Sequence, residues 1–290
     1  MEKAALFLRA AATAAGVLVF GAWTVCGAEE EGVRQQHLDN AGKHRVDGCD
    51  GIRHPLGEVE FEVSSDSASK YVSRGVAIND EPVMQPRARV CWQGVELSVW
   101  GNVDFTDANG RKNQFQEVDY TVSYSHAFKN LGALKTLTLT GGVIFYEFPG
   151  SAPATQELFL SASLDELFLK PTLTAYYDFN KADALYLNPT IEHSFATPWE
   201  RAELTLKGGI GWGDANFNSF NMGMAQPHAG FMEVTLSATL GIKITDNISC
   251  GPFVAWSGVP DSRIRTAAKA ADRDGHASHL WYGFGLSARF

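Results

Sequence analysis

Basic residues and cysteines are scarce in this sequence. Its 290 residues include 24 lysines and arginines against 33 aspartates and glutamates, a formal charge of -9. Nucleic-acid binding needs a basic stripe, so no nucleic-acid partner is expected. Only 45% of the residues are hydrophobic, which is too few for a bundle of membrane-spanning helices. The four cysteines have no zinc-binding spacing, and no cofactor is expected.

Residues 1–28 have the pattern of a cleaved secretory signal. Lys3 and Arg9 form a positive n-region, residues 10–20 form an apolar h-region, and residues 26–28 form a small-residue cleavage site. Two alternatives to a cleaved signal are a membrane anchor and a lipoprotein signal with acylation at Cys26. The signal predicts export from the cytoplasm.

Three cysteines would remain after cleavage, an odd number in an oxidising compartment. These are Cys49, Cys91 and Cys250, of which at most one pair can form a disulfide. Strand-like surroundings favour the interpretation of Cys91 and Cys250 as small apolar packing residues. Residues 29–56 are polar, charged and without period, and are predicted to be a disordered periplasmic lead-in or a small plug.

From residue 57 onward, short segments alternate apolar and polar residues. One clear example is "TLTLTGGVIFY" at 136–146, which has the length of a tilted bilayer-spanning strand. An even number of such strands is typical of antiparallel outer-membrane barrels, so the fold predicted for 57–290 is all-β, a transmembrane β-barrel of about twelve strands. The predicted strands are 57–66, 82–92, 95–105, 117–126, 136–146, 157–164, 172–179, 185–195, 203–212, 233–242, 247–256 and 279–290.

Connection lengths support this count, because inner turns and outer loops of membrane barrels differ in length. The two longest connections, 214–230 and 257–278, fall on the same side, where they would narrow the outer mouth. Both termini of the barrel would then lie in the periplasm. The predicted inner turns are 93–94, 129–133, 165–170, 197–200 and 246–247.

The chain ends on the alternating strand "LWYGFGLSARF", whose last residue is Phe290. Its even-numbered positions from Leu280 are apolar, while Ser287 and Arg289 lie on the opposite face. A closing strand with a terminal aromatic residue resembles the assembly signal of outer-membrane barrels. That resemblance implies recognition by the barrel-assembly machinery and a final place among outer-membrane lipids.

A box near the start of the predicted barrel, "SKYVSRG" at 69–75, is followed by a Pro-Val-x-Gln-Pro stretch and a Trp-Gly strand. This arrangement resembles a family of uncharacterised bacterial outer-membrane β-barrel proteins, which usually has Trp where this chain has Ser73. The resemblance implies fold and location more than activity. It is carried by Ser69, Lys70, Tyr71, Val72, Arg74, Gly75, Pro82, Val83, Gln85, Pro86, Trp100 and Gly101.

Charged residues fall on the polar face of the predicted strands, where they would line the lumen. Glu58, Glu60 and Glu62 of the first strand should lie beside Arg87 and Arg89 of the second. They form either an ion-paired wall or a transverse field that orients solutes. Predicted lumen acids outnumber bases, which favours a passive, cation-biased channel for small polar solutes. The candidate selectivity residues are Arg74, Arg87, Arg89, Glu96, Asp104, Asp119 and Glu233.

Arg74 has two interpretations. It could form a cationic constriction or ligand contact, or it could clamp the first loop by pairing with carboxylates of the lumen or loops. The residue should lie near the outer end of the first strand, together with Lys70 and Tyr71, with Gly75 beginning the turn. The clamp is the favoured interpretation.

Two other functions stay open. A closed structural or adhesive barrel would bind partners through its outer loops. A lipid hydrolase would need a Ser-His-acid constellation, for which Ser67, Ser125-His126 and Glu192-His193 give only fragments. The pair His276-x-x-His279 is likewise a partial ligand set, so no catalytic residue and no metal site is predicted.

Overall fold

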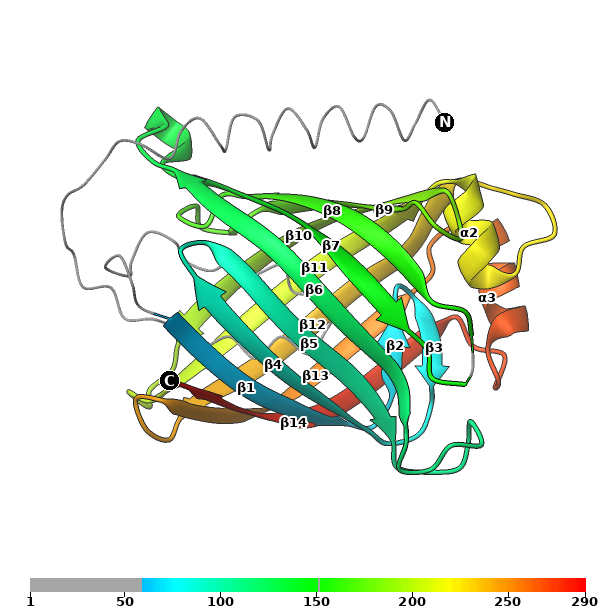
Figure 1. Ribbon diagram of the computed structural model, residues 1–290, viewed down its shortest axis with the longest axis horizontal. Coiled ribbons are helices and arrows are strands. Elements are labelled where there is room, and N and C mark those ends of the chain that lie inside the picture. Colours follow the sequence, from blue (N-terminus) through cyan, green and yellow to red (C-terminus); the bar gives the residue numbers. More distant parts are fainter. Residues whose placement is uncertain (1–58, 151) are drawn as a thin grey trace.

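The computed structural model describes residues 59–150 and 152–290, arranged as one closed antiparallel barrel of twelve strands (Figure 1). Each barrel strand pairs with its neighbours along the chain, and β1 closes the barrel against β14. The predicted twelve-stranded barrel is confirmed. The barrel strands are β1 (Val59–Ala68), β4 (Val83–Trp92), β5 (Val95–Asp104), β6 (Phe115–Phe128), β7 (Leu137–Glu147), β8 (Thr155–Ser163), β9 (Thr172–Asp178), β10 (Ala184–Ala196), β11 (Ala202–Gly213), β12 (Gly230–Lys243), β13 (Ile248–Gly258) and β14 (Ser278–Arg289).

The predicted signal at 1–28, the lead-in at 29–56, Cys49 and Glu58 lie outside the described residues. A short 3-10 helix, η1 (Gly132–Leu134), lies in the β6–β7 connection. Within the described part of the chain, no helix is long and apolar enough to cross a membrane.

Alternation along each strand gives the barrel two chemically different faces. In β14, Leu280, Tyr282 and Phe284 are 60%, 66% and 50% exposed on the outside, whereas Trp281 and Ser287 are buried on the inside. Valine, leucine and phenylalanine side chains are exposed in the same way on other strands, β1 and β5 among them. Such an apolar outer face is stable in lipid rather than in water, as expected for a membrane-spanning barrel.

The two ends of the barrel differ, and they are named here by the chain termini. At the terminal end β1 begins, β14 ends and the connections are mostly short turns such as Gln93-Gly94. At the far end lie the longest connections, in agreement with the predicted loop alternation. Phe290 stacks on Phe61 at the terminal end, with ring centroids 6.4 Å apart, and their backbones exchange hydrogen bonds of 2.8 and 3.0 Å. The last residue therefore completes the closing seam.

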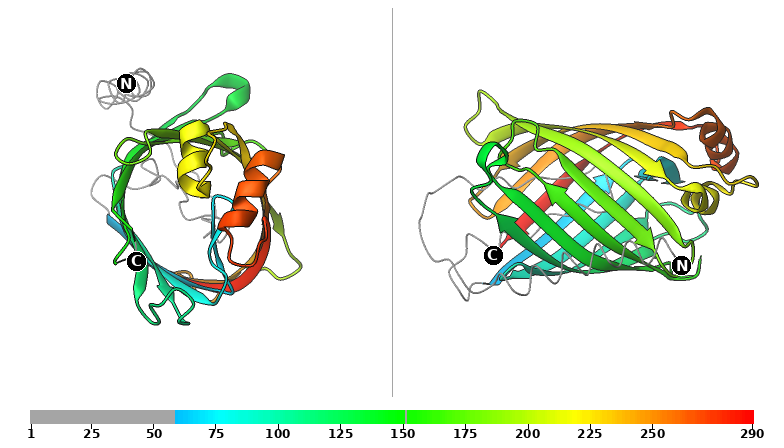
Figure 2. Two further views of the ribbon diagram at one scale, coloured as in Figure 1. Left: turned by 90° about the vertical axis from the view of Figure 1, so that its right-hand side faces the viewer. Right: turned by 90° about the horizontal axis from the view of Figure 1, so that it is seen from above.

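The two longest far-end connections contain helices that the sequence interpretation treated only as loops. Helix α2 spans Ala215–Met222 and helix α3 spans Ser262–Ala271. Each begins after an aspartate whose carboxylate accepts backbone N–H groups of the first turn, Asp214 for α2 and Asp261 for α3. Both helices lie over the far opening (Figure 2, left), so the two connections do extend across the mouth.

The residues after β1 form a small hairpin of β2 (Tyr71–Ser73) and β3 (Val76–Asn79), which folds into the barrel at its far end (Figures 1 and 2). Lys70, Tyr71 and Arg74 thus lie close to the outer end of the first strand, as expected, but they belong to an inward hairpin rather than to the barrel wall. Strand β1 ends at Ala68, paired with Val83 of β4, and the chain then turns inward. The hairpin buries apolar side chains inside the far half. This burial offsets the strand pairing that a longer β1 would have made.

Two apolar clusters fill the far half of the barrel around this hairpin. One joins Tyr71 and Val72 of β2 to inward residues of β4, β13 and β14, including Phe253 and Trp281. The other joins helix residues such as Phe217 to strands β7 to β10 and β12. Packed apolar side chains thus occupy much of the far half, and hydrophobic burial holds the hairpin and both helices in place.

The hairpin turn has two residues with positive φ, Arg74 at 48° and Gly75 at 79°, as in the tight turns that connect twisted strands. A Cβ on Gly75 would lie 2.7 Å from the Met232 carbonyl oxygen and 3.1 Å from Glu233 Cβ. At Gly110, where φ is 73°, a Cβ would meet nothing within 4 Å. Gly75 therefore permits both the turn and its close approach to β12.

Substitution of Gly75 and of Gly110 by alanine separates two contributions to the free energy of unfolding: the strain of a positive φ and the overlap of the new methyl group with its neighbours. The positive φ should cost about 1–2 kcal/mol of unfolding free energy at either site. Gly75→Ala should cost roughly 1–3 kcal/mol more than Gly110→Ala, because only there does the methyl group overlap a neighbour. Urea unfolding in lipid vesicles, followed by tryptophan fluorescence, measures both values. Equal costs at the two sites would contradict the packing of the turn against β12.

The N-terminus of α3 is sensitive to acid. Burial favours the protonated form of Asp261, but hydrogen bonds from His228 and from the backbone N–H groups of Ile264 and Arg263 outweigh it and lower the pKa of this carboxyl below its ordinary 3.8. Because the folded pKa is depressed, the carboxylate stabilises α3 fully above 3.8, and this contribution is lost as the pH falls through the lowered value.

Hydrogen exchange of α3 should therefore accelerate when the pH falls below about 3.8, after correction for intrinsic exchange rates. Asp261→Asn is the matched control, because asparagine caps helices nearly as well but does not titrate. The corrected protection of α3 in this variant should not change over the same pH range. The same acid response in the variant would show that another group is responsible.

Candidate functional site in the barrel lumen

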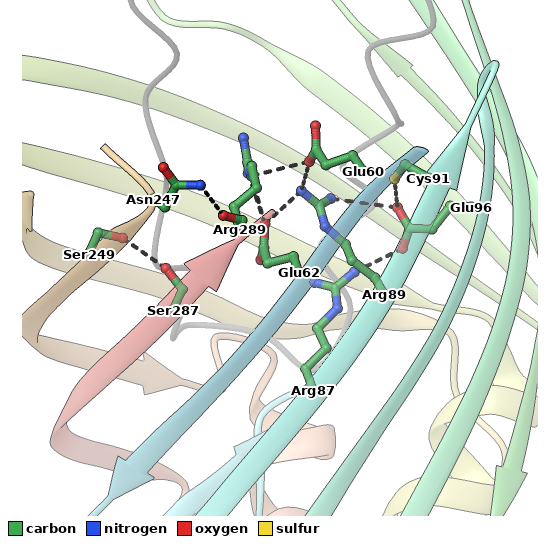
Figure 3. Close-up of polar contacts among 10 residues, drawn as sticks. All are labelled: Glu60, Glu62, Arg87, Arg89, Cys91, Glu96, Asn247, Ser249, Ser287 and Arg289. Atoms are coloured by element: carbon green, nitrogen blue, oxygen red, sulfur yellow. Dashed lines mark hydrogen bonds and ion pairs between the residues drawn. The ribbon is translucent and has the colours of Figure 1, made fainter. Parts of the chain in front are cut away.

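Six charged side chains from four adjacent strands meet inside the barrel near its terminal end (Figure 3). Three are guanidinium groups and three are carboxylates, so the group is formally neutral. We call it the terminal network. Its members are Glu60, Glu62, Arg87, Arg89, Glu96 and Arg289.

Arg89 occupies the centre of the terminal network. Its guanidinium lies 2.9 Å from Glu62, 3.4 Å from Glu60 and 3.7 Å from Glu96. Arg289 reaches the same two β1 carboxylates, at 3.1 Å from Glu60 and 2.8 Å from Glu62. The strand register explains this convergence, because Glu62 stands opposite Arg89 on one side and opposite Arg289 on the other. The network therefore joins the closing seam to the neighbouring wall.

The predicted pairing of Glu60 and Glu62 with arginines of the second strand is confirmed for Arg89. Arg87 instead binds Glu96 on β5, at 3.0 Å. The pairing of Arg289 across the seam was not predicted, although alternation places it on the inward face. An ion-paired wall agrees with these contacts.

Cys91 follows the terminal network on β4 and is buried. Cys91 is disulfide-bonded, whereas Cys250 is a free thiol. The interpretation of Cys91 as only a small packing residue is therefore wrong.

The tip of the β2–β3 hairpin places Arg74 in a second site, in the far half of the lumen. We call its surroundings the Arg74 pocket. The guanidinium donates two hydrogen bonds of 2.6 Å, one to each carboxylate oxygen of Glu157. The favoured prediction, a clamp between Arg74 and a lumen carboxylate, agrees with this geometry. The pocket consists of Tyr146, Glu157, Tyr176, Tyr186 and Phe217.

Three aromatic rings complete the Arg74 pocket. The guanidinium carbon lies 4.9 Å from the ring centroid of Tyr176, 4.8 Å from that of Tyr186 and 5.2 Å from that of Phe217. These distances are within the range of cation–π attraction, which strengthens away from water. Arg74 is only 18% exposed and Glu157 only 4%. The pair is therefore a desolvated contact rather than a surface ion pair.

Carboxylates dominate the far half of the lumen. Most contact neutral donors: Tyr71 donates to Glu117 at 2.9 Å, Asn102 to Asp104 at 2.9 Å and Thr155 to Asp178 at 2.7 Å. Hydroxyl and amide donors satisfy an oxygen's hydrogen bonds without cancelling its charge. The buried acids at this end are Asp104, Glu117, Asp119, Glu157, Asp178, Asp214 and Glu233.

The structure places the seven candidate selectivity residues in the terminal network or in the far half of the lumen. Arg87, Arg89 and Glu96 belong to the terminal network. Asp104, Asp119 and Glu233 are buried in the far half, where Glu233 accepts a hydrogen bond from Tyr186, and Arg74 fills its pocket. The aromatic members of the pocket were missed, although Tyr146, Tyr176 and Tyr186 alternate onto the same inward face as the acids. Their shared inward position in the strand alternation could have predicted that these tyrosines line the lumen.

The residues of the segment "SKYVSRG" at 69–75, with others shortly after it, build the hairpin and its base. The backbone N–H of Ser69 donates to Tyr282 O at 2.8 Å, and its hydroxyl accepts from Tyr282 N at 3.1 Å. Tyr71 packs on Trp100, with ring centroids 5.6 Å apart. Gln85 donates to Asn102 at 3.2 Å. The box thus fixes an inward hairpin against the barrel wall.

The fragments considered for hydrolysis are divided by strand alternation. On β6, Ser125 hydrogen-bonds to Thr140 at 2.8 Å on the inside, while the next residue, His126, lies against the ring of Phe128. Glu192 and His193 are separated in the same way on β10. Among residues 59–150 and 152–290, no group of three or more His, Cys, Asp or Glu side chains could hold a metal ion.

A closed antiparallel barrel with an apolar outer face and a charged interior defines the class of this protein as a membrane-type β-barrel. No family model and no curated protein matches the chain, so membership of the family with the Ser-Lys-Tyr-Val-x-Arg-Gly box stays a prediction. Solved structures do match it at low identity, and they are similar in fold alone.

Three of these structures illustrate how similar the folds are. The NanC porin is 13% identical, with a TM-score of 0.46, and the match covers 80% of this chain and 99% of that one. The KdgM porin, solved in complex with disordered oligogalacturonate, is 11% identical, with a TM-score of 0.44 and the same coverage. The translocator domain of autotransporter NalP from Neisseria meningitidis is 10% identical, with a TM-score of 0.38, over 83% and 91%.

Proposed function

We propose that this protein is an outer-membrane channel through which small polar solutes diffuse passively, with a bias toward cations. The observation that carries the proposal is that the outer face of the barrel is apolar and its inner face is charged, the reverse of a water-soluble protein. A barrel that faces lipid needs the first property, and a path for polar solutes needs the second. Export would depend on the predicted signal at 1–28, and insertion on the assembly machinery acting at Phe290.

The distribution of charge along the lumen supports the cation bias. The terminal network is neutral, so it shapes the wall without favouring either sign of ion. The far half holds seven buried carboxylates, with the Arg74 guanidinium among them. An excess of negative charge between low-dielectric walls attracts cations and repels anions. The bias should therefore arise mainly in the far half.

Planar-bilayer recordings under a potassium chloride gradient test this proposal. Glu96→Gln and Asp104→Asn each remove one negative charge from the lumen, so the double variant should show a smaller cation-selective reversal potential than the wild type. Asp246→Asn, at the exposed β12–β13 turn, is the matched control and should leave the potential unchanged. Equal potentials in the wild type and the double variant would remove these carboxylates from the pathway.

A closed barrel that binds a partner is the second candidate, and one observation favours it. Helix α3 exposes Arg263, Arg265 and Lys269 at the far end of an otherwise acidic chain. A basic helical face attracts polyanions, such as acidic polysaccharide. Retention of the wild type on an immobilised acidic polysaccharide, lost when the three residues become serine, together with absence of conductance, would favour this function over the channel.

A further inference from the structure

We propose that the Arg74 pocket is a binding site for planar cations of the guanidinium class, which the β2–β3 hairpin fills with its own side chain and an incoming cation can take over. Arg74 would then act as an internal ligand that competes with solutes. This inference rests on the proposed function, because a cation must reach the lumen to compete.

The contacts in the pocket match a guanidinium better than an ammonium group. Glu157 uses both oxygens toward two guanidinium nitrogens, and Tyr146 adds a longer contact of 3.5 Å. The rings of Tyr176, Tyr186 and Phe217 lie within 5.2 Å of the guanidinium carbon. A planar fork can pair with a carboxylate through two parallel hydrogen bonds and stack on aromatic faces together. A tetrahedral ammonium can do only part of this.

The pocket is held together by contacts that do not involve Arg74. Tyr146 donates to Glu157 at 2.6 Å, and Tyr186 donates to Glu233. The rings of Tyr186 and Phe217 stack with centroids 4.9 Å apart and an interplanar angle of 19°. Most of these residues belong to barrel strands, and the helix that carries Phe217 is packed in the far-end core. The site should therefore persist, ready for another cation, when the arginine leaves.

Although Tyr71 and Val72 anchor the hairpin in its apolar cluster, the hairpin tip that carries Arg74 is the more easily displaced side of this contact. Its strands have only three and four residues, and a two-stranded hairpin is marginally stable by itself. Arg74 also has a φ of 48°, in the left-handed region that non-glycine residues rarely adopt. Withdrawal of the tip would release this strain. A free guanidinium in the pocket would replace the Arg74 side chain in its hydrogen bonds to Glu157 and in its stacking on the three rings.

Binding of methylguanidinium to Arg74→Asn tests the inference. Asparagine tolerates a positive φ, so the variant keeps the turn while vacating the pocket. Titration calorimetry of the refolded protein in micelles should show methylguanidinium binding to the variant about tenfold or more tightly than to the wild type, whose pocket is mostly occupied. Methylammonium should show no such gain. Arg273→Asn, an exposed arginine paired with Asp80 at the same end, is the matched control and should bind like the wild type.

A second measurement needs no variant. Saturating methylguanidinium should accelerate hydrogen exchange of the wild-type hairpin, residues 71–79, whereas methylammonium at the same concentration should not. Unchanged exchange at 71–79, or equal binding of methylguanidinium by wild type and Arg74→Asn, would overturn the inference.

These results can be told apart from failure of the channel itself. Conductance without any gain in methylguanidinium binding would refute the pocket and leave the channel standing. Binding of methylguanidinium by Arg74→Asn, in a protein that does not conduct, would establish the pocket and refute the channel.

Discussion

Replacement of Glu157 by glutamine should lower the free energy of unfolding by about 3–5 kcal/mol, the usual cost of leaving a buried charge without its partner. Glu157 holds Arg74 through two hydrogen bonds of 2.6 Å, and its side chain is only 4% exposed. Glutamine has nearly the same shape but offers one acceptor oxygen and no charge. The guanidinium would then remain among aromatic rings without a carboxylate.

Glu192→Gln is the control for this substitution. Glu192 pairs with Lys170 at 3.9 Å, and the lysine side chain is 29% exposed. Such a partly solvated pair should contribute only about 0–1 kcal/mol. Urea unfolding in lipid vesicles gives both values under one set of conditions. A cost for Glu157→Gln no larger than that of the control would contradict a tight, desolvated clamp at Arg74.

Removal of the β2–β3 hairpin should raise the unitary conductance of the barrel by about twofold or more, because the hairpin and its apolar cluster fill the far half. The hairpin can be removed without shortening a barrel strand. Ala68 and Val83 are directly paired across β1 and β4, so residues 69–82 can be replaced by the two-residue turn Asn-Gly. The barrel strands and their register are left intact.

The control for the excision is a shortened connection at the same end. Residues 107–112 of the β5–β6 loop are largely exposed, and two glycines in their place should leave the conductance nearly unchanged. Heat-modifiable migration on gels shows whether each variant has folded into a barrel. A folded excision variant that conducts no better than the wild type would show that the hairpin is not the constriction.

The walls of the barrel could be predicted from the sequence because every spanning strand alternates between lipid and lumen. The segment predicted at 136–146 is β7, Leu137–Glu147, and that predicted at 279–290 is β14, Ser278–Arg289. The same alternation placed Glu96 in the lumen. Strand position and inward parity are local properties, which a single sequence contains.

The contents of the barrel could not be predicted in the same way. Strands β2 and β3 are too short for a period to be measured, and Arg74 meets Glu157 across 83 positions of the chain. The two helices were missed because they are short and lie in connections without a strand period, where only the signals of a helix start could reveal them. Asp214 and Asp261, each at a helix start, were the available ones. The disulfide state of Cys91 likewise could not be read from an alternating strand pattern.

The reversal potential of the refolded wild-type protein, with residues 1–28 removed, would decide whether this barrel is a cation-biased channel. The measurement is made in planar bilayers with a potassium chloride gradient. Discrete conductance steps with a reversal potential displaced toward that of potassium are expected from the excess of carboxylates in the far half. A folded barrel that passes no current, or one whose reversal potential moves toward that of chloride, would contradict the proposed function.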